Sequence, residues 1–179
     1  MLVLLAWVSK LELTIRLVVA VPSLGFAQAY VHASAAIDTA TPKVPPEVLL
    51  SIAYVESRFD VTATSRIEGK VRRTGAYRST SPPRNLTGTL YCGPLQTFAK
   101  DWDECLQMRD VGLAYRAGVD EMQRWMSDPR VRNDLTRALL GHGCGNRGIA
   151  SGRCNRYPGR VLHFLRRLSG TARVRPPST

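Results

Sequence analysis

The segment Val44-Pro-Pro-Glu-Val-Leu-Leu-Ser-Ile-Ala-Tyr-Val-Glu-Ser-Arg-Phe-Asp60 combines a helix start, an apolar stripe and a carboxylate at its end. Pro45 and Pro46 suit the first turn of a helix, because the backbone N–H groups there have no acceptor within the helix. The apolar residues that recur at helical spacing are Val48, Ile52, Val55 and Phe59. Glu56 ends this stripe, so we expect its carboxylate to be partly desolvated, which favours the protonated form that a general acid needs. An ordinary solvated glutamate is the alternative interpretation.

Three further motifs follow Glu56-Ser57 in a fixed order: Gly93-Pro-Leu-Gln96, Ala138-Leu-Leu-Gly-His-Gly-Cys-Gly145, and Tyr157 four residues before Val161. This series resembles lytic transglycosylases of the soluble-lytic type, which are lysozyme-fold enzymes that cut the glycan strands of peptidoglycan. The family pattern is an apolar helix ending in Glu-Ser, then Gly-Leu-Met-Gln, then Ala-x-x-Ala-Tyr-Asn-x-Gly, then a late Tyr before a Val. The resemblance covers roughly residues 43–168.

The resemblance implies a mainly α (α+β) fold, a lysozyme-like helical domain with a small β-hairpin or sheet after the catalytic helix. Residues 61–91 are rich in Thr, Ser and Gly and predict the same turn-rich sheet. Helical spacing predicts further helices through Phe98 to Cys105, through residues 111–126, and through residues 131–139, the last stopped by the glycines that begin at Gly141. A last amphipathic helix follows Tyr157.

The roles of four residues are carried over from the family. Glu56 would protonate the glycosidic oxygen as acid and then act as base in the second half-reaction. Ser57 would hydrogen-bond near the reacting sugar, and Gln96, on the turn that starts at Gly93, would bind substrate. Tyr157 would place its hydroxyl against Glu56 and hold its orientation.

The chain departs from the family pattern where the family has Tyr-Asn, because it has His142 and Gly143 there. Loss of the Asn amide removes a sugar contact. His142 is therefore either a substrate-binding residue of the cleft or a structural histidine. Pro94 and Leu95 also replace the Leu and Met of the family motif.

A length of 179 residues predicts a single domain. The formal net charge of +11 predicts that its surface is attracted to polyanions. Nucleic acid, an anionic membrane and an acidic cell wall all fit such a charge. No zinc-finger spacing or RNA-binding aromatic signature is present, so we expect no specific nucleic-acid partner. The expected partner is the peptidoglycan glycan strand, within a possible envelope-spanning or virion assembly.

The two ends of the sequence read differently from its middle. Residues 1–29 hold two apolar runs and a small-residue site, which predicts a signal peptide or an amphipathic anchor segment, with any membrane contact confined to it. The transglycosylase domain would span 30–168, and 169–179 would be a flexible basic tail. The chain would be exported, periplasmic or in the cell envelope, or part of a phage virion.

The four cysteines favour two short-range disulfides, Cys92–Cys105 and Cys144–Cys154, as expected in an oxidising compartment. By the chain-entropy model, each would contribute about 3 kcal/mol to stability. A zinc site of His142 with cysteines is the alternative, but no Cys-x-x-Cys spacing exists. We expect neither a metal ion nor an organic cofactor.

The number of carboxylates near Glu56 decides between hydrolysis and ring closure by the substrate. Residues 69–100 contain no Asp or Glu, so the second carboxylate that hydrolysis of a glycosidic bond requires would have to come from elsewhere. Glu68 is the nearest candidate, and Asp101, Asp103 and Glu104 follow on the next helix, but each is more simply interpreted as a surface charge. By resemblance, the substrate's own 6-hydroxyl then closes the ring and gives a 1,6-anhydromuramyl product from the MurNAc-GlcNAc β-1,4 bond. A hydrolytic, goose-lysozyme-like muramidase with Glu68 as second carboxylate, or a module that binds the wall without cutting it, are the alternatives.

Overall fold

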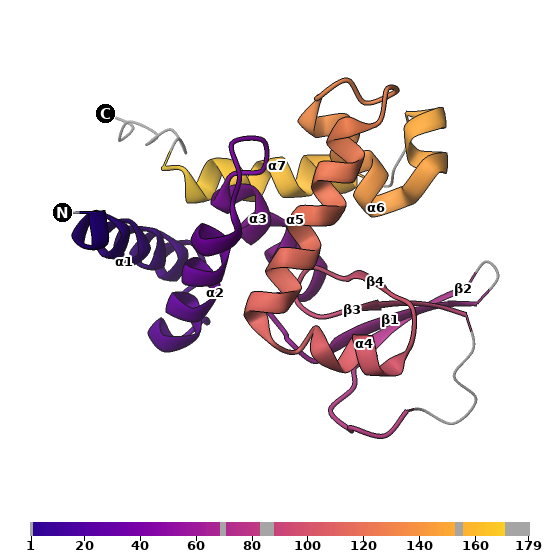
Figure 1. Cartoon of the computed structure of the whole chain (residues 1–179), viewed down its shortest axis with the longest axis horizontal. Coiled ribbons are helices and arrows are strands. Elements are labelled where there is room, and N and C mark those ends of the chain that lie inside the picture. The colour runs from indigo at the N-terminus through magenta and orange to yellow at the C-terminus, as the bar shows by residue number, and fades with distance from the viewer. Residues whose placement is uncertain (1, 69–70, 83–87, 153–155, 171–179) are drawn as a thin grey trace, which may run out of the picture.

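The computed structural model describes residues 2–68, 71–82, 88–152 and 156–170 (Figure 1). The elements in these ranges are, in chain order, α1 (Leu2–Ala20), α2 (Phe26–Thr39), α3 (Pro46–Ser57), β1 (Ala63–Glu68), β2 (Val71–Ala76), β3 (Thr89–Cys92), β4 (Thr97–Ala99), α4 (Trp102–Gln107), α5 (Val111–Ser127), α6 (Leu135–Ser151) and α7 (Tyr157–Leu168). The prediction of a mainly helical α+β fold, with a small sheet directly after the helix of Glu56, is confirmed.

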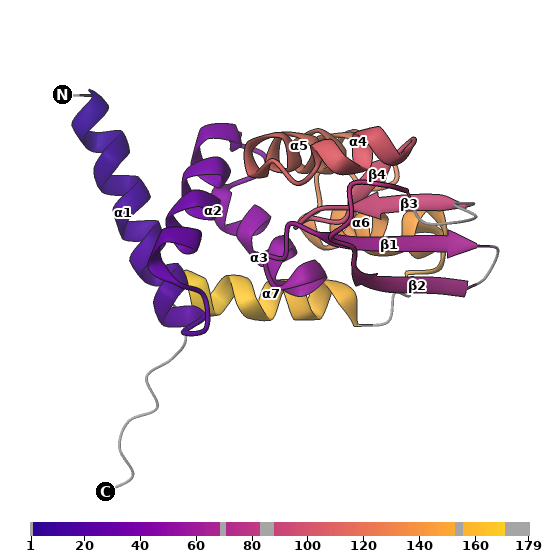
Figure 2. The ribbon, with the colours of Figure 1, turned by 90° about the horizontal axis from the view of Figure 1, so that it is seen from below.

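The helices and the sheet are separated along the length of the molecule. Helices α1 and α2 lie at one end and the sheet lies at the other, with α3 between them (Figures 1 and 2). Helix α7 lies alongside α3, and α5 packs on both α2 and α6. One continuous set of buried apolar side chains extends from α1 to α7, so the described helices share a single core.

Helix α3 ends abruptly, and this ending places Glu56 at the edge of the core. Pro45 precedes the helix in extended conformation and Pro46 opens it, as predicted. At the other end, Arg58 (φ 59°) and Phe59 (φ 68°) adopt left-handed backbone conformations that reverse the chain. Phe59 is fully buried, with its ring 5.0 Å from that of His32. The burial of Phe59 therefore anchors the reversal that leaves Glu56 in the last turn.

The chain then forms a four-stranded antiparallel sheet in the order β2-β1-β3-β4. This confirms the sheet predicted within residues 61–91 and extends it by one strand. Tyr91 of β3 pairs with Ser65 on one side and with Phe98 on the other. Phe98, expected in a helix, thus lies in β4, and its side chain is half exposed. The helix begins only at Trp102, because the Asp101 carboxylate caps it by accepting the Glu104 N–H at 2.9 Å.

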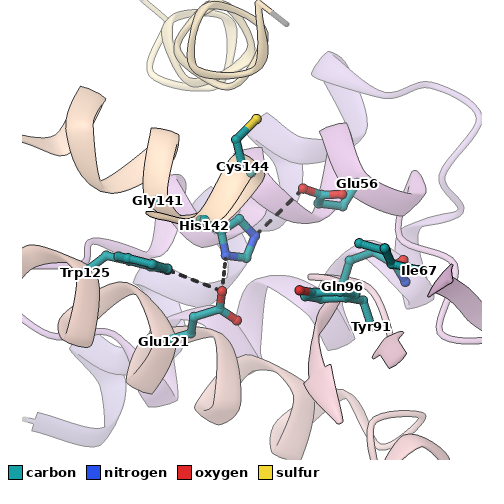
Figure 3. Close-up of a pocket in the computed structure, with 11 residues that line it drawn as sticks. Glu56, Ile67, Tyr91, Gln96, Glu121, Trp125, Gly141, His142 and Cys144 are labelled. Carbon is teal, nitrogen blue, oxygen red and sulfur yellow. Dashed lines mark hydrogen bonds and ion pairs between the residues drawn. The ribbon is translucent and has the colours of Figure 1, made fainter. Parts of the chain in front are cut away.

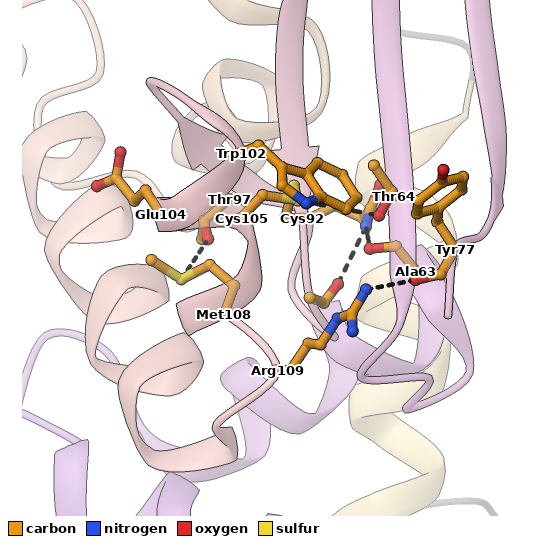
Figure 4. The surroundings of a disulfide bond; sticks show 12 residues. Ala63, Thr64, Tyr77, Cys92, Thr97, Trp102, Glu104, Cys105, Met108 and Arg109 are labelled. Carbon is orange, nitrogen blue, oxygen red and sulfur yellow. Dashed lines mark hydrogen bonds between the residues drawn. A yellow bond between two sulfur atoms is a disulfide. The ribbon is translucent and has the colours of Figure 1, made fainter. Parts of the chain in front are cut away.

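The sheet is fastened to α4 by covalent and polar contacts (Figure 4). The predicted disulfide between Cys92 of β3 and Cys105 of α4 is confirmed. Beyond α4, Arg109 donates to the backbone carbonyls of Tyr77 (2.6 Å) and Ser79 (2.7 Å). The segment that leaves β2 is thereby held against the end of α4.

Helix α6 corrects one prediction. The glycines from Gly141 onward do not stop it, because the helix continues to Ser151 with a single break at Gly145 (φ 59°, ψ −157°). Glycine is needed instead for close packing. A Cβ on Gly141 would lie 2.5 Å from the Trp125 ring, and one on Gly143 would lie 2.5 Å from the Tyr157 ring. The glycines let two aromatic rings rest directly on the helix backbone.

The N-terminal segment is part of the folded core. Leu13, Leu17 and Ala20 of α1 are buried in it, and Arg16 donates to the Leu168 carbonyl of α7 at 2.7 Å. The predicted boundary after residue 29 falls inside α2. No helix in the part of the chain that the structure describes is long and apolar enough to cross a membrane. Cleavage of residues 1–29 stays a prediction.

Two predictions reach beyond the described ranges. Cys144 is disulfide-bonded, but its predicted partner Cys154 lies outside the described residues. The predicted basic tail is described only at positions 169–170, because residues 171–179 also lie outside them.

Candidate active site

A cavity of about 230 Å³ lies between the end of α3, the sheet, α5 and α6 (Figure 3). Its walls carry both acidic and aromatic side chains. The polar and aromatic residues that line it are Glu56, Tyr91, Gln96, Glu121, Trp125 and His142. Three of the five predicted site residues, Glu56, Gln96 and His142, thus meet in one place although the sequence separates them widely.

Glu56 stands in the last turn of α3, and its side chain is only 9% exposed. One of its carboxylate oxygens, Oε1, lies 3.8 Å from Nε2 of His142. That separation is within ion-pair range but longer than a hydrogen bond. The expectation that the Glu56 carboxylate is largely removed from water is therefore met.

His142 links two carboxylates. Its Nδ1 lies 3.1 Å from Oε1 of Glu121, and the Trp125 indole N–H donates to the same Glu121 oxygen at 3.4 Å. The His142 and Glu121 side chains are 2% and 10% exposed. Figure 3 shows the resulting row, from Trp125 through Glu121 and His142 to Glu56.

Electrostatics favours opposite charges on His142 and Glu121. Burial alone opposes a charge on the imidazole, but the charge and hydrogen bond of Glu121, and then the charge of Glu56, outweigh it and raise the pKa of His142 above 6.5. Burial likewise opposes ionisation of Glu121, but His142 first, and then Trp125 and Arg124, lower the pKa of that carboxyl below 4.5. The imidazole of His142 thus tends to be a cation between two acidic groups.

Gln96 presents an acceptor to the cavity. It is 3% exposed, and its amide donates to the carbonyls of Ala63 (2.9 Å) and Gly93 (3.0 Å). Both donors are thereby occupied, which fixes the orientation of the amide. The remaining oxygen, Oε1, has no hydrogen-bond partner among the described residues. A buried acceptor without a partner is suited to a ligand N–H or O–H.

Ser57 lies behind the cavity wall and is not one of its lining residues. Its hydroxyl lies 2.9 Å from the Pro94 carbonyl and 3.2 Å from that of Ala53, and it can donate to either. The first contact ties the end of α3 to the turn that carries Gln96. The structure thus gives Ser57 a positioning role, and its predicted contact with sugar stays a prediction.

Tyr157 begins α7, and its ring packs against Gly143 with its centroid 6.0 Å from that of His142. It therefore supports α6 close to His142. The predicted hold of its hydroxyl on Glu56 stays a prediction.

The sequence analysis missed Glu121, Tyr91 and Trp125. Trp125 lies on the helix predicted through residues 111–126, and it lines the cavity. A signal for Glu121 was present, because it falls three residues after Gly118 and four before Trp125, on the otherwise apolar face of α5. An acidic residue in that position has to be solvated by a cavity or paired with another buried group.

A second hollow of about 390 Å³ adjoins the first and shares Tyr91, Glu121 and Trp125 with it. Phe98 and Asn146 are among its other lining residues. The two hollows are therefore adjacent, and the rings of Tyr91 and Trp125 line both of them.

The arrangement offers no evident metal site. Among the residues that the structure describes, no group of three or more His, Cys, Asp and Glu side chains is placed to hold a metal ion. The chemistry that the cleft can perform with its own groups is proton transfer by Glu56, with a charged neighbour in His142.

Comparison of the chain with protein-family models, with curated proteins and with solved structures finds no match.

Proposed function

We propose that the chain is a peptidoglycan lytic transglycosylase with a lysozyme-like fold, which cleaves the MurNAc-GlcNAc β-1,4 bond and releases a 1,6-anhydromuramyl product. The observation that carries this proposal is the buried Glu56 at the end of α3, facing a cleft between the sheet and two helices. A buried carboxylic acid beside a cleft is placed to give its proton to a sugar oxygen bound there.

Glu56 performs both proton transfers of this reaction. It first donates its proton to the glycosidic oxygen, and the bond from that oxygen to the muramyl C1 breaks while the substrate's N-acetyl group stabilises the cation. The Glu56 carboxylate then takes the proton of the sugar's 6-hydroxyl, whose oxygen bonds to C1. The catalyst returns to its starting state and no water is consumed.

The other cleft residues bind and orient the strand. The free Oε1 of Gln96 accepts a hydrogen bond from a sugar hydroxyl or amide. The rings of Tyr91 and Trp125 offer flat apolar faces, on which sugar rings pack. The formal net charge of +11 attracts the acidic wall. This function also fits an exported protein, in the periplasm, in an envelope-spanning assembly or in a virion.

Hydrolysis by a muramidase is the second candidate, and Glu121 is the observation that favours it. The sequence offered Glu68 as second carboxylate, whereas the structure places Glu121 in the cavity, with Oε2 lacking a hydrogen-bond partner among the described residues. A second carboxylate across the sugar could activate water. The contacts of Glu121 with His142 and Trp125 disfavour this role, because they already occupy its carboxylate oxygen Oε1.

Digestion of purified sacculi by the purified chain, followed by mass spectrometry of the released muropeptides, tests the proposal. We expect anhydromuramyl ends, lighter by one water than the hydrolysis products, and a loss of about 100-fold or more in Glu56→Gln. Glu12→Gln is the matched control, because Glu12 is exposed on α1. Reducing muramic ends would instead make the chain a muramidase.

Release of no fragments at any pH, together with retention on sacculi, would indicate a wall-binding module without catalysis. A co-sedimentation assay with the same sacculi separates this third possibility from a chain that has no affinity for the wall.

A further inference from the structure

The imidazole of His142 is held in place from every side that the structure describes. On one side its Nδ1 meets Glu121, whose Oε1 also accepts the Trp125 indole N–H. Gly141 and Gly143, one residue to either side of His142, lie directly on the rings of Trp125 and Tyr157, so α6 cannot shift without displacing them. The imidazole therefore has little freedom to turn.

This restraint aims Nε2 of His142 at Glu56. Nε2 is buried and makes no hydrogen bond of ordinary geometry with the described residues, and Oε1 of Glu56 lies 3.8 Å away (Figure 3). The Leu95 backbone also interacts with the imidazole and helps to raise its pKa. When Nδ1 donates to a carboxylate, the tautomer and orientation of the ring are fixed, and any further proton has to sit on Nε2. A small rotation of the Glu56 side chain would close the gap to a hydrogen bond.

We propose that Glu121 and His142 form a positioning pair that keeps an imidazolium against Glu56 and so sets the pH range in which Glu56 can act as an acid. The proposal rests on the function proposed above for Glu56, and it adds a task for two residues that do not touch the glycosidic bond. It also explains why an acidic residue occupies the apolar face of α5.

The pair has two opposite effects on the reaction. An imidazolium beside Glu56 stabilises the carboxylate that forms once the proton has gone to the glycosidic oxygen. The same charge also favours a carboxylate at position 56 before the reaction, so removal of the pair should change the pH dependence of cleavage.

Other charged and titratable groups around His142 are few. Glu121 and, one turn away, Arg124 belong to α5, Glu56 belongs to α3, and Tyr157 belongs to α7. Tyr91 of β3 lines the same cavity. The raised pKa of His142 comes mainly from Glu121, so removal of that carboxylate is the most direct way to disturb the imidazolium.

The first test does not depend on enzymatic activity. The full chain contains three histidines, and the imidazole nitrogen signals of His142 can be assigned by comparison with His142→Gln. We expect the NMR titration midpoint of His142 to lie above 6.5, and to fall in Glu121→Gln because the carboxylate that contributes most to the raised pKa is lost. A midpoint at or below 6.5 in the parent chain would overturn the proposal.

The second test is the pH dependence of wall cleavage. The alkaline limb of the rate profile should move upward in His142→Gln, and in the same direction in Glu121→Gln. Asp120→Asn is the matched control, because Asp120 precedes Glu121 on α5 but is exposed, and it should leave the limb in place. A purely structural role would lower the rate at all pH values without moving the limb, and that result would refute the pair.

The two proposals fail in different ways. Absence of cleavage at every pH, with the expected NMR titration, would remove the enzymatic function while leaving the charged pair intact. Cleavage with an unmoved alkaline limb would leave the enzyme and remove the pair.

Discussion

Gly118 lies directly against Leu95: a Cβ at position 118 would come within 2.5 Å of Cδ2 of Leu95. Leu95 is buried and immediately precedes Gln96, so this contact connects the middle of α5 to the turn that carries the cavity's free acceptor. The close packing at Gly118 therefore affects the site. The contact between Gly118 and Leu95 holds the turn that carries Gln96 against α5.

Gly118→Ala should consequently destabilise the fold, although alanine is the better helix former. The added methyl group has to displace Leu95, and overpacking of this kind costs about 1–3 kcal/mol. Gly159→Ala in α7 is the control, since no atom lies within 4 Å of a Cβ there, and it should be neutral or stabilising. Urea unfolding of the three proteins measures the effect, and equal stability of both variants would contradict it.

Ser57→Ala should loosen the turn that carries Gln96. The hydroxyl that reaches the Pro94 carbonyl is lost, which costs about 1 kcal/mol of stability. If the proposed function holds, the Michaelis constant for glycan should rise more than the turnover number falls, because Gln96 binds the strand. Ser151→Ala removes a hydroxyl from the exposed end of α6 and serves as the control. A fall in turnover alone would argue for a direct role of Ser57 at the reacting sugar.

Leu17→Ala should be strongly destabilising. The Leu17 side chain is fully buried, and truncation of a buried leucine costs about 2–5 kcal/mol. Val19→Ala, two residues further along the same helix, changes a side chain in a residue that is 74% exposed and should stay within about 0.5 kcal/mol of the parent. Denaturant midpoints compare the two. Similar midpoints would show that α1 is not part of the stable domain, as a removable leader requires.

Acid should destabilise the fold through His32. Burial lowers the pKa of this histidine to about 4, and a hydrogen bond with the backbone of Phe59 offsets burial only in part. The unfolded chain therefore takes up a proton near pH 6.5 that the folded chain refuses until about pH 4. Stability is complete above pH 6.5 and declines as the pH falls through this window, by roughly 3 kcal/mol in total.

Comparison of unfolding free energies at several pH values in the parent and in His32→Gln measures this contribution. The variant should lose the decline assigned to His32, and His163→Gln, which alters an exposed side chain of α7, should keep it. His142 contributes with the opposite sign, because its raised pKa stabilises the fold at acid pH, but it is present in all three proteins. An unchanged acid decline in His32→Gln would count against the assignment.

Local patterns in the sequence were enough to predict α3, α5 and the sheet, because each depends on spacing within one segment. They failed at Phe98, where pairing with Tyr91 in the sheet prevails over helical spacing. They failed again in α6, where the glycines are required because the rings of Trp125 and Tyr157, from other helices, pack directly against them. A glycine that ends a helix and one that admits a neighbour look the same in sequence.

The candidate site was predictable only in part for a similar reason. Glu56, Gln96 and His142 were found through a resemblance in motif order, and the structure brings them to one cavity. Glu121 belongs to no motif, and its importance follows from its contact with His142. Such a pair becomes visible only when α5 and α6 are packed together.

The contacts of Gly141 with Trp125 and of Gly143 with Tyr157 have an evolutionary consequence. Neither glycine can gain a side chain while its ring remains, so substitution at one position of a pair requires a smaller residue at the other. In a set of diverged relatives, positions 141 and 125, and positions 143 and 157, should covary. The residues on either side of His142 would then change during evolution only together with the aromatic residues that they contact.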